Sequence, residues 1–203
     1  IKIENLKELG YKEIAVLEHQ EIVVFVKENL KLKNTYTFNY KSFNLIFLGI
    51  LSFVIFNDFI KNDLKFPQLI SQISWGLALC VLLIPIHELI HLLAYKLFKA
   101  PKLRIDMNLK KFYFMAVAPG FVVNVKEFIY IAFAPFVIIS IALISTYLIF
   151  IDSNFWFLLF SLFLHVGFCT GDFALLSYCK SINNPNWITY DDYDKKISYF
   201  LVK

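Results

Sequence analysis

Long runs of apolar residues dominate the chain. Four of them, at residues 43–60, 69–98, 128–151 and 155–179, approach or exceed the roughly 20 residues that a helix needs to cross the apolar part of a bilayer. The second run is interrupted by Pro85. This pattern predicts an all-α membrane protein with about four transmembrane helices.

The segments outside these runs mix polar and apolar residues. Residues 1–42 are expected to form a small appendage, with a short helix over 5–10 and a β-rich run over 22–26. Residues 180–203 are expected to form a tail that starts as a turn and closes with a short helix. The expected organisation is therefore an N-terminal appendage, a four-span core over 43–179 and a C-terminal tail.

The segment between the second and third runs, residues 102–125, alternates between apolar and polar positions more than it follows a helical period. This alternation predicts two strands or a small β-hairpin, with Pro119-Gly120 as a turn. The edge of such a hairpin would suit a substrate segment that binds as an additional strand. A plain connecting loop with a turn is the alternative.

Basic residues are distributed very unevenly. The chain carries 20 basic and 16 acidic residues, a net charge of +4. Eighteen of the basic residues lie in 1–42, in 96–126 and in the tail, and only Lys61 and Lys65 lie between the first two runs. By the positive-inside rule, both termini and the central loop are expected in the cytoplasm. So small an excess of positive charge indicates no nucleic-acid partner.

The composition agrees with a membrane protein. Hydrophobic residues make up 59% of the chain and charged residues 18%, against about 45–50% and about 25% in average soluble domains. The abundance of Lys, Asn, Ile, Phe and Tyr is typical of AT-rich genomes, so we expect a multi-pass protein of a bacterial cytoplasmic membrane. The three cysteines, Cys80, Cys169 and Cys179, lack metal-binding spacing and are expected to be buried free thiols.

One motif in the second run carries chemistry: His87-Glu88-Leu89-Ile90-His91. At 3.6 residues per turn the two histidines stack on one helix face, where both can reach one Zn²⁺ ion. Glu88 then lies near a water on the metal and can act as the general base. The alternative is that the histidines hydrogen-bond inside the helix bundle and that Glu88 is a neutral acid.

Zinc needs a third protein ligand, and Asp172 is the only carboxylate deep in another apolar run. The second and fourth runs are expected to point the same way, which places Asp172 level with His91. His165 lies two turns before Asp172 and is expected to be a polar group of the cavity or to hydrogen-bond to a zinc ligand. The alternatives are a structural histidine and a zinc ligand. His19, in the appendage, is expected to be solvated.

These residues together resemble a family of bacterial polytopic membrane proteins described as zincin peptidases, related in pattern to intramembrane metalloproteases of the site-2 protease type. The resemblance rests on the motif at 87–91, on residues 118–136 and on Gly171-Asp172. It implies that His87 and His91 are zinc ligands, that Asp172 is the third ligand and that Glu88 is the catalytic base. In site-2 proteases a glycine usually follows this aspartate, whereas here a glycine precedes it.

The leading hypothesis is therefore a membrane-embedded zinc metallopeptidase that hydrolyses a peptide bond in or near the bilayer, with Glu88 as the general base for a zinc-activated water. Two other functions remain open. One is a zinc-binding carrier or sensor without peptidase activity, and the other is a zinc hydrolase that acts on a non-peptide substrate. The expected partners are membrane lipid and a membrane protein or peptide substrate. The sequence does not specify the oligomeric state.

Overall fold

The computed structural model describes residues 3–61, 64–110, 113–153, 155–182 and 184–203. The chain divides into two compact units, which are described separately. The first, called the sheet unit, comprises Ile1–Thr37, Glu88–Ala134 and Gly171–Lys203. The second, called the helical unit, comprises Phe38–His87 and Pro135–Thr170.

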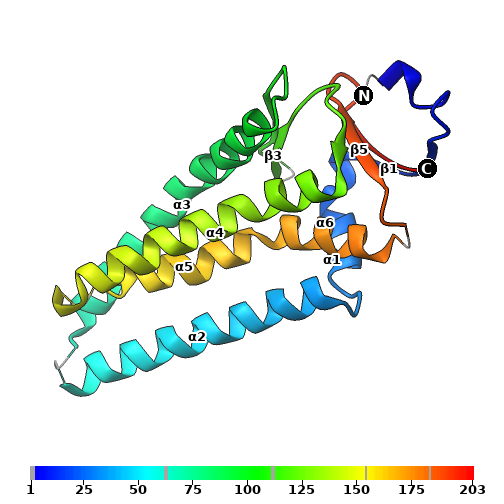
Figure 1. The fold of residues 1–203 in the computed structure, drawn as a ribbon. Helices are drawn as coiled ribbons and strands as arrows, with labels where there is room; N and C mark the ends of the chain where they lie inside the picture. The colour runs from blue at the N-terminus through cyan, green and yellow to red at the C-terminus, as the bar shows by residue number, and fades with distance from the viewer. Residues whose placement is uncertain (1–2, 62–63, 111–112, 154, 183) are drawn as a thin grey trace. The chain divides into compact units, whose positions relative to one another are not determined.

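Three helices of the described chain are long and apolar enough to cross a membrane. They are α2 (Thr35–Lys61), α3 (Phe66–Leu97) and α4 (Val125–Ile149), all visible in Figure 1. They match the first three apolar runs, so the chain is compatible with a multi-pass membrane protein. Helix α3 continues through Pro85, so no interruption occurs there. Apolar spans tolerate proline because neighbouring groups can satisfy the carbonyl that it leaves without a partner.

The fourth apolar run forms two helices rather than one. Helix α5 (Phe157–Phe168) ends at Cys169, and α6 (Thr170–Ser181) begins directly after it. Together they are long and apolar enough to form one broken span or a re-entrant loop, with a bend of 41° between them. The Thr170 hydroxyl donates a hydrogen bond to the Gly167 carbonyl. Such a side-chain bond competes with the helical backbone ladder at the break.

The sheet unit contains a four-stranded antiparallel sheet with the strand order β1-β6-β5-β4. Its strands are β1 (Lys12–Glu18), β4 (Val123–Asn124), β5 (Ile188–Asp192) and β6 (Ile197–Val202). Strand β1 of the appendage pairs with β6 of the tail (Figure 1). The prediction of an all-α chain is therefore wrong for this unit, because the pairing joins residues about 180 positions apart that a local pattern cannot connect.

The predicted hairpin in the central loop is confirmed. Strands β2 (Arg104–Asn108) and β3 (Tyr113–Val117) pair in antiparallel order, with Asp106 opposite Met115. The turn at Pro119-Gly120 also exists, and Gly120 has a φ of +73°. It lies after β3 and leads to β4, so it does not join the two hairpin strands.

Three local predictions are wrong. Residues 5–10, expected to form a short helix, form turns after residue 5, where a 3-10 helix over Ile3–Asn5 ends. Residues 22–26, expected to be β-rich, begin helix α1 (Ile22–Asn29), whose Ile22 and Phe25 side chains pack on the core. Packing of an apolar helix face here outweighs the weak strand preference of the valines. The tail, expected to end in a helix, forms β5 and β6 instead. The short 3-10 helices are η1 (Ile3–Asn5), η2 (His19–Glu21) and η3 (Ile151–Ser153).

Side-chain caps fix where two of the long helices begin. Asn34 Oδ1 accepts hydrogen bonds from the backbone N–H groups of Tyr36 (3.0 Å) and Thr37 (3.3 Å) at the start of α2. At the start of α4, Asn124 Oδ1 accepts from the Glu127 N–H (3.1 Å), and Glu127 Oε2 accepts from the Asn124 N–H (3.0 Å). This reciprocal pair is a capping box, which satisfies two backbone donors at once.

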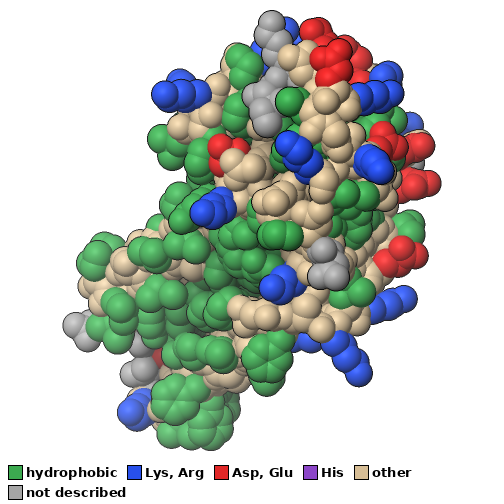
Figure 2. All heavy atoms as spheres, turned by 45° about the vertical axis from the view of Figure 1, so that its right-hand side comes forward, with side chains coloured by type: hydrophobic (Ala, Val, Ile, Leu, Met, Phe, Trp, Pro, Cys, Tyr) green, Lys and Arg blue, Asp and Glu red, His purple; other side chains and the backbone are tan. Residues whose placement is uncertain are grey.

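The helical unit carries its apolar side chains outward as well as inward. Large exposed hydrophobic residues include Phe53, Phe56, Trp75, Val81 and Ile141. Figure 2 shows mainly hydrophobic side chains over the helices of this unit, whereas charged side chains gather over the sheet unit. Inside the helical unit, the fully buried Trp156 donates a hydrogen bond from Nε1 to Asp58 Oδ2 (3.2 Å). An apolar surface of this kind suits contact with lipid.

Helices α3 and α5 approach closely at Gly76, and replacing this glycine should loosen them. A Cβ at Gly76 would lie 2.4 Å from Phe160 Cδ1 and 3.2 Å from the Phe157 carbonyl oxygen. We expect Gly76→Ala to destabilise the protein by about 1–3 kcal/mol through overpacking. Thermal unfolding in detergent measures the loss. Gly49→Ala is the matched control, because a Cβ there meets nothing within 4 Å, and an equal loss in both variants would contradict the close approach.

Candidate metal and catalytic site

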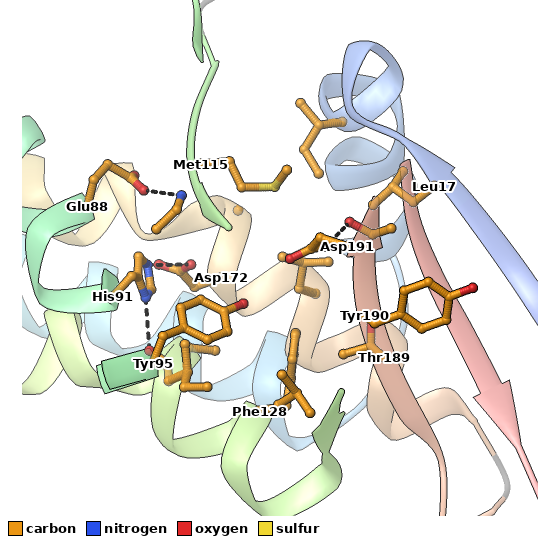
Figure 3. Close-up of a pocket in the computed structure, with 18 of the residues that line it drawn as sticks. Leu17, Glu88, His91, Tyr95, Met115, Phe128, Asp172, Thr189, Tyr190 and Asp191 are labelled. Atoms are coloured by element: carbon orange, nitrogen blue, oxygen red, sulfur yellow. Dashed lines mark hydrogen bonds and ion pairs between the residues drawn. The ribbon is translucent and has the colours of Figure 1, made fainter. Parts of the chain in front are cut away.

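Two residues of the predicted zinc site lie side by side in the sheet unit. His91 belongs to α3 and Asp172 to the first turn of α6, and His91 Nε2 lies 3.2 Å from Asp172 Oδ1 (Figure 3). The His91 side chain is buried, and that of Asp172 is 16% exposed. A tetrahedral zinc ion with bonds of about 2.0–2.1 Å holds its ligand atoms about 3.3–3.4 Å apart. The two atoms are therefore spaced like two ligands of one ion.

The tautomer of His91 is set by the backbone of α4. His91 Nδ1 lies 2.9 Å from the carbonyl oxygen of Ile131, which can only accept, so Nδ1 carries a proton and donates it. The lone pair of a neutral ring then sits on Nε2 and faces the Asp172 carboxylate. The lone pair on His91 Nε2 and those on Asp172 Oδ1 repel each other at 3.2 Å unless a proton or a cation lies between the two atoms. This donor set fits a metal ion, and the backbone partner of His91 is typical of zinc-binding histidines.

Glu88 points at the backbone of the hairpin. Its Oε2 accepts a hydrogen bond of 2.8 Å from the Ala116 N–H in β3. Ala116 lies opposite Ile105 in β2, and residues of an antiparallel strand alternate between bonding to the partner strand and facing away from it. Because the Ala116 N–H faces away from β2, that of Phe114 does so too. The outer edge of β3 therefore presents backbone donors and acceptors beside Glu88.

One cavity of about 110 Å³ connects these groups. Its lining includes Glu88, His91, Asp172, residues 113–116 of β3 and residues 189–191 of β5 (Figure 3). Apolar side chains such as Leu17 and Phe128 form the remaining wall. A mostly apolar cavity with a few convergent polar groups is the usual form of a binding site. Glu88, His91 and Asp172 thus share one small space with the edge of β3.

A buried polar network ties the hairpin to the four-stranded sheet. Asp106 of β2 accepts 2.8 Å hydrogen bonds from His19 Nδ1 and Lys196 Nζ, and His19 Nε2 lies 3.2 Å from Ser198 Oγ in β6. His19 is 0% exposed, so the prediction that it is solvated is wrong. It follows directly on β1, and the pairing of β1 with β6 carries it into the interior. The network thereby supports the strand that lines the cavity.

The charge of Asp106 is stabilised by this network. Burial alone would raise the pKa of the carboxyl, but the hydrogen bonds and positive charges of Lys196 and His19 outweigh burial and hold the pKa below its ordinary value. The ionised carboxylate therefore stabilises the fold at any pH above the unfolded value of about 4. That contribution is lost as the pH falls through the lower folded value.

Asp106→Asn should therefore destabilise the protein at neutral pH and much less in acid. We expect a loss of about 1–2 kcal/mol at pH 7, less than for a fully buried pair because the Lys196 side chain is 53% exposed. Thermal unfolding at pH 7 and below pH 4 measures the difference. Asp192→Asn, which removes an i,i+3 pair with Lys195, is the control and should change little. An Asp106→Asn loss that persists unchanged in acid would contradict the ionised state.

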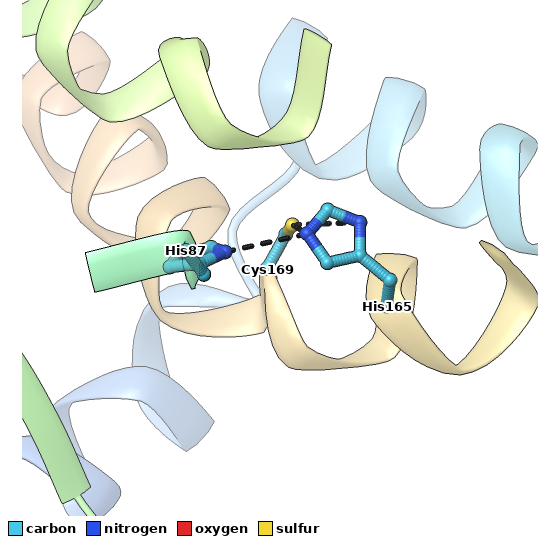
Figure 4. Close-up of side chains that lie close together, drawn as sticks. All are labelled: His87, His165 and Cys169. Carbon is cyan, nitrogen blue, oxygen red and sulfur yellow. Dashed lines mark hydrogen bonds between the residues drawn. The ribbon is translucent and has the colours of Figure 1, made fainter. Parts of the chain in front are cut away.

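The other predicted residues meet in the helical unit. His87 Nδ1 of α3 lies 3.3 Å from His165 Nε2 of α5, and Cys169 Sγ lies 3.7 Å from the same His165 nitrogen (Figure 4). All three residues are buried, as are the other two cysteines, Cys80 and Cys179. His165 is thus a direct neighbour of His87. Sequence reasoning did not identify Cys169 as a partner, because a single thiol in an apolar run carries no signal of its neighbours.

Three further groups of the site also lacked a sequence signal. The Ile131 carbonyl and the Ala116 N–H are backbone groups, which every residue carries. Asp191 lines the cavity from β5 and accepts a 2.6 Å hydrogen bond from Ser198. Burial raises the pKa of Asp191, although the hydrogen bond from Ser198 and the charge of His19 oppose that effect.

Three helices long and apolar enough to cross a membrane, and a cavity lined by Glu88, His91 and the partly buried Asp172, are compatible with a membrane-associated metallohydrolase. The comparison with family models identifies the group within this class. Residues 80–185, just over half of the chain, match the family described as "Putative zincin peptidase", and the chain belongs to that family. The matched segment contains Glu88, His91 and Asp172. No curated protein and no solved structure matches the chain.

Proposed function

We propose that the protein is a membrane-embedded zinc metallopeptidase of the site-2 protease type, with His87, His91 and Asp172 as zinc ligands and Glu88 as the general base. The observation that carries the proposal is the pairing of His91 Nε2 with Asp172 Oδ1 at 3.2 Å, in one cavity with Glu88. The family match supports zinc dependence and peptidase activity. An ordinary structural ion pair would not require a second carboxylate and a cavity beside it.

His87 completes the proposed ligand set through the geometry of α3. The helix runs without a break from Phe66 to Leu97, so His87 lies one turn before His91 on the same face. Its Nδ1 faces His165 Nε2 at 3.3 Å. If His87 Nδ1 carries a proton and donates it to His165, the lone pair of His87 lies on Nε2. The hydrogen bond to the Ile131 carbonyl has the same effect on His91. His165 is therefore proposed as a positioning residue for His87.

The residues of the site would divide the chemistry between them. A zinc ion held there supplies a Lewis acid that polarises the scissile carbonyl and lowers the pKa of a water towards about 7. Glu88 takes the proton from the attacking water and delivers it to the leaving nitrogen. The Ala116 N–H orients the Glu88 carboxylate through Oε2. In both proton transfers the Glu88 carboxylate stays at the cavity that Glu88 lines together with His91 and Asp172.

The substrate would bind as an extended strand along β3. The outward N–H and C=O groups of Phe114 and the outward C=O of Ala116 form an edge that can pair with a peptide, while the Ala116 N–H stays on Glu88. Both residues line the cavity that contains Glu88. Extension also exposes the scissile amide, which a helix shields and hydrogen-bonds. A membrane protein or peptide that unwinds locally next to β3 is therefore the proposed substrate.

The division of the chain supports the proposed topology. The sheet unit is assembled from the N-terminal segment, the central segment and the C-terminal segment, which are the parts that carry most of the basic residues. By the positive-inside rule this unit would face the cytoplasm, with both termini in it. We propose a multi-pass protein of a bacterial cytoplasmic membrane whose catalytic cavity opens near the cytoplasmic face.

Zinc content tests the proposed function directly. We expect the full chain, purified in detergent and loaded with zinc, to hold one zinc ion per chain by elemental analysis. His87→Ala should reduce this to less than about one tenth, because the loss of a protein ligand costs more than the 10–100-fold that is typical of outer partners. His19→Gln, a change of another buried histidine, is the control and should keep the ion. A wild-type protein that binds no zinc would overturn the proposal.

A further inference from the structure

The helical unit holds a second group of metal-binding side chains. His87, His165 and Cys169 each offer one ligand atom, and these atoms all lie within 4.8 Å of one another. His165 and Cys169 are one helical turn apart at the end of α5, and His87 reaches them from α3 (Figure 4). All three side chains are buried, at 8%, 1% and 0% exposure respectively.

Two of the three separations match the edges of a tetrahedral metal site, and the third lies within 4.8 Å. Two imidazole nitrogens bound to one zinc ion lie about 3.3 Å apart, and a nitrogen and a thiolate sulfur about 3.6 Å apart. The observed values are 3.3 Å for His87 Nδ1 to His165 Nε2 and 3.7 Å for His165 Nε2 to Cys169 Sγ. The three atoms could thus be bridged by one ion with little movement.

We propose that His87, His165 and Cys169 form a second metal position, which binds a zinc-class divalent ion through two imidazole nitrogens and one thiolate and competes with the catalytic position for His87. Binding releases the Cys169 thiol proton to solvent and forms a bond between the metal and sulfur. The negative thiolate neutralises one of the two positive charges of the ion. A buried metal site needs such compensation because an uncompensated charge is costly to bury. A sulfur ligand also selects borderline and soft ions such as Zn²⁺ over Mg²⁺ or Ca²⁺.

The competition follows from the chemistry of one imidazole ring. A neutral ring has a single lone pair, which lies on Nδ1 or on Nε2. The second position uses Nδ1, the nitrogen that faces His165, whereas the catalytic position is proposed to use Nε2. An ion in the second position therefore removes His87 from the catalytic one and inhibits the enzyme. This competition rests on the proposed function, but the second position itself does not.

Cobalt(II) spectroscopy on the full chain in detergent separates the two positions. A thiolate bound to Co²⁺ gives a charge-transfer band in the near ultraviolet, which histidine and aspartate ligands do not give. In Asp172→Ala the catalytic position loses a ligand, so added Co²⁺ should occupy the second position and produce the band. Adding Cys169→Ser to this variant should abolish the band. Adding Cys179→Ser, the control for another buried thiol, should leave it unchanged.

Several results would overturn the second position. An Asp172→Ala protein without the band at excess Co²⁺ would do so, and so would a band that survives Cys169→Ser. His165→Gln provides a second variant, in which the affinity of the band-forming site should fall at least about tenfold. Thermal unfolding of each variant without metal verifies that it is folded.

The remaining outcomes separate this proposal from the proposed function. One outcome is that wild-type protein shows visible cobalt bands but that neither wild type nor Asp172→Ala shows the thiolate band. This outcome would overturn the second position and leave the catalytic one intact. Wild type that binds no Co²⁺ would overturn both. At saturation, one ion per wild-type chain is expected, and two ions would overturn the competition for His87.

Discussion

Glu88→Gln should keep its zinc and lose its activity. We expect hydrolysis of a quenched fluorescent peptide with an apolar segment to fall by at least about 100-fold, the usual contribution of a general base. The amide oxygen of the glutamine can still accept the Ala116 N–H, so the fold around β3 is preserved. The amide cannot take a proton from water, so only the chemical step is lost. Zinc content by elemental analysis should stay at one ion per chain.

Glu127→Gln is the matched control for Glu88→Gln. Glu127 belongs to the capping box of α4, and a glutamine there can still bond to the Asn124 N–H. Its hydrolysis rate should stay close to that of wild type. A Glu88→Gln protein that hydrolyses peptide at the wild-type rate would contradict the role of Glu88. Zinc movement into liposomes that is equal in wild type and Glu88→Gln, without hydrolysis in either, would favour the carrier hypothesis.

Asp172→Ala should weaken zinc binding at the catalytic position by at least about 100-fold. The expected loss exceeds the 10–100-fold that follows when an outer partner of a ligand is removed, because Asp172 is proposed to contact the ion itself. The measurement is best made with Cys169→Ser in both proteins, so that the second position cannot retain the ion. Competition against a coloured zinc chelator gives the two dissociation constants.

Asp191→Asn separates the loss of a ligand from the loss of negative charge in the cavity. Asp191 lines the same cavity, but its Oδ1 bonds to Ser198 Oγ at 2.6 Å, and the proposed ligand set does not include it. In the Cys169→Ser background we expect its zinc affinity to change less than tenfold. Equal losses in Asp172→Ala and Asp191→Asn would contradict a specific ligand role for Asp172.

Local patterns were sufficient to predict several parts of the fold. Three apolar runs correspond to α2, α3 and α4, and the alternating segment at 102–125 contains the β2–β3 hairpin. These elements depend on periodicity within a short stretch of chain, which the sequence displays directly. The spacing of His87, Glu88 and His91 follows from the same helical period.

Pairings between distant segments were not predictable. Local patterns predict a turn and a short closing helix for the tail and a β-rich run over 22–26. The structure differs at both places because other segments pack against them. The contact of His19 with Asp106 likewise depends on β1 reaching β6. Local propensity differences are small, of the order of 1 kcal/mol per residue or less, and tertiary packing readily exceeds them.

The sequence by itself determined the apolar spans and the residue types of the site, because a 3.6-residue period and a costly ionisable cluster in an apolar run are visible locally. Only the tertiary structure decided the partners of those residues. It brought Asp172 and the Ile131 carbonyl into contact with His91, and the edge of β3 into contact with Glu88. It also placed His165 and Cys169 beside His87. Such contacts join atoms, many of them in the backbone, from segments far apart in the chain, and no local pattern specifies them.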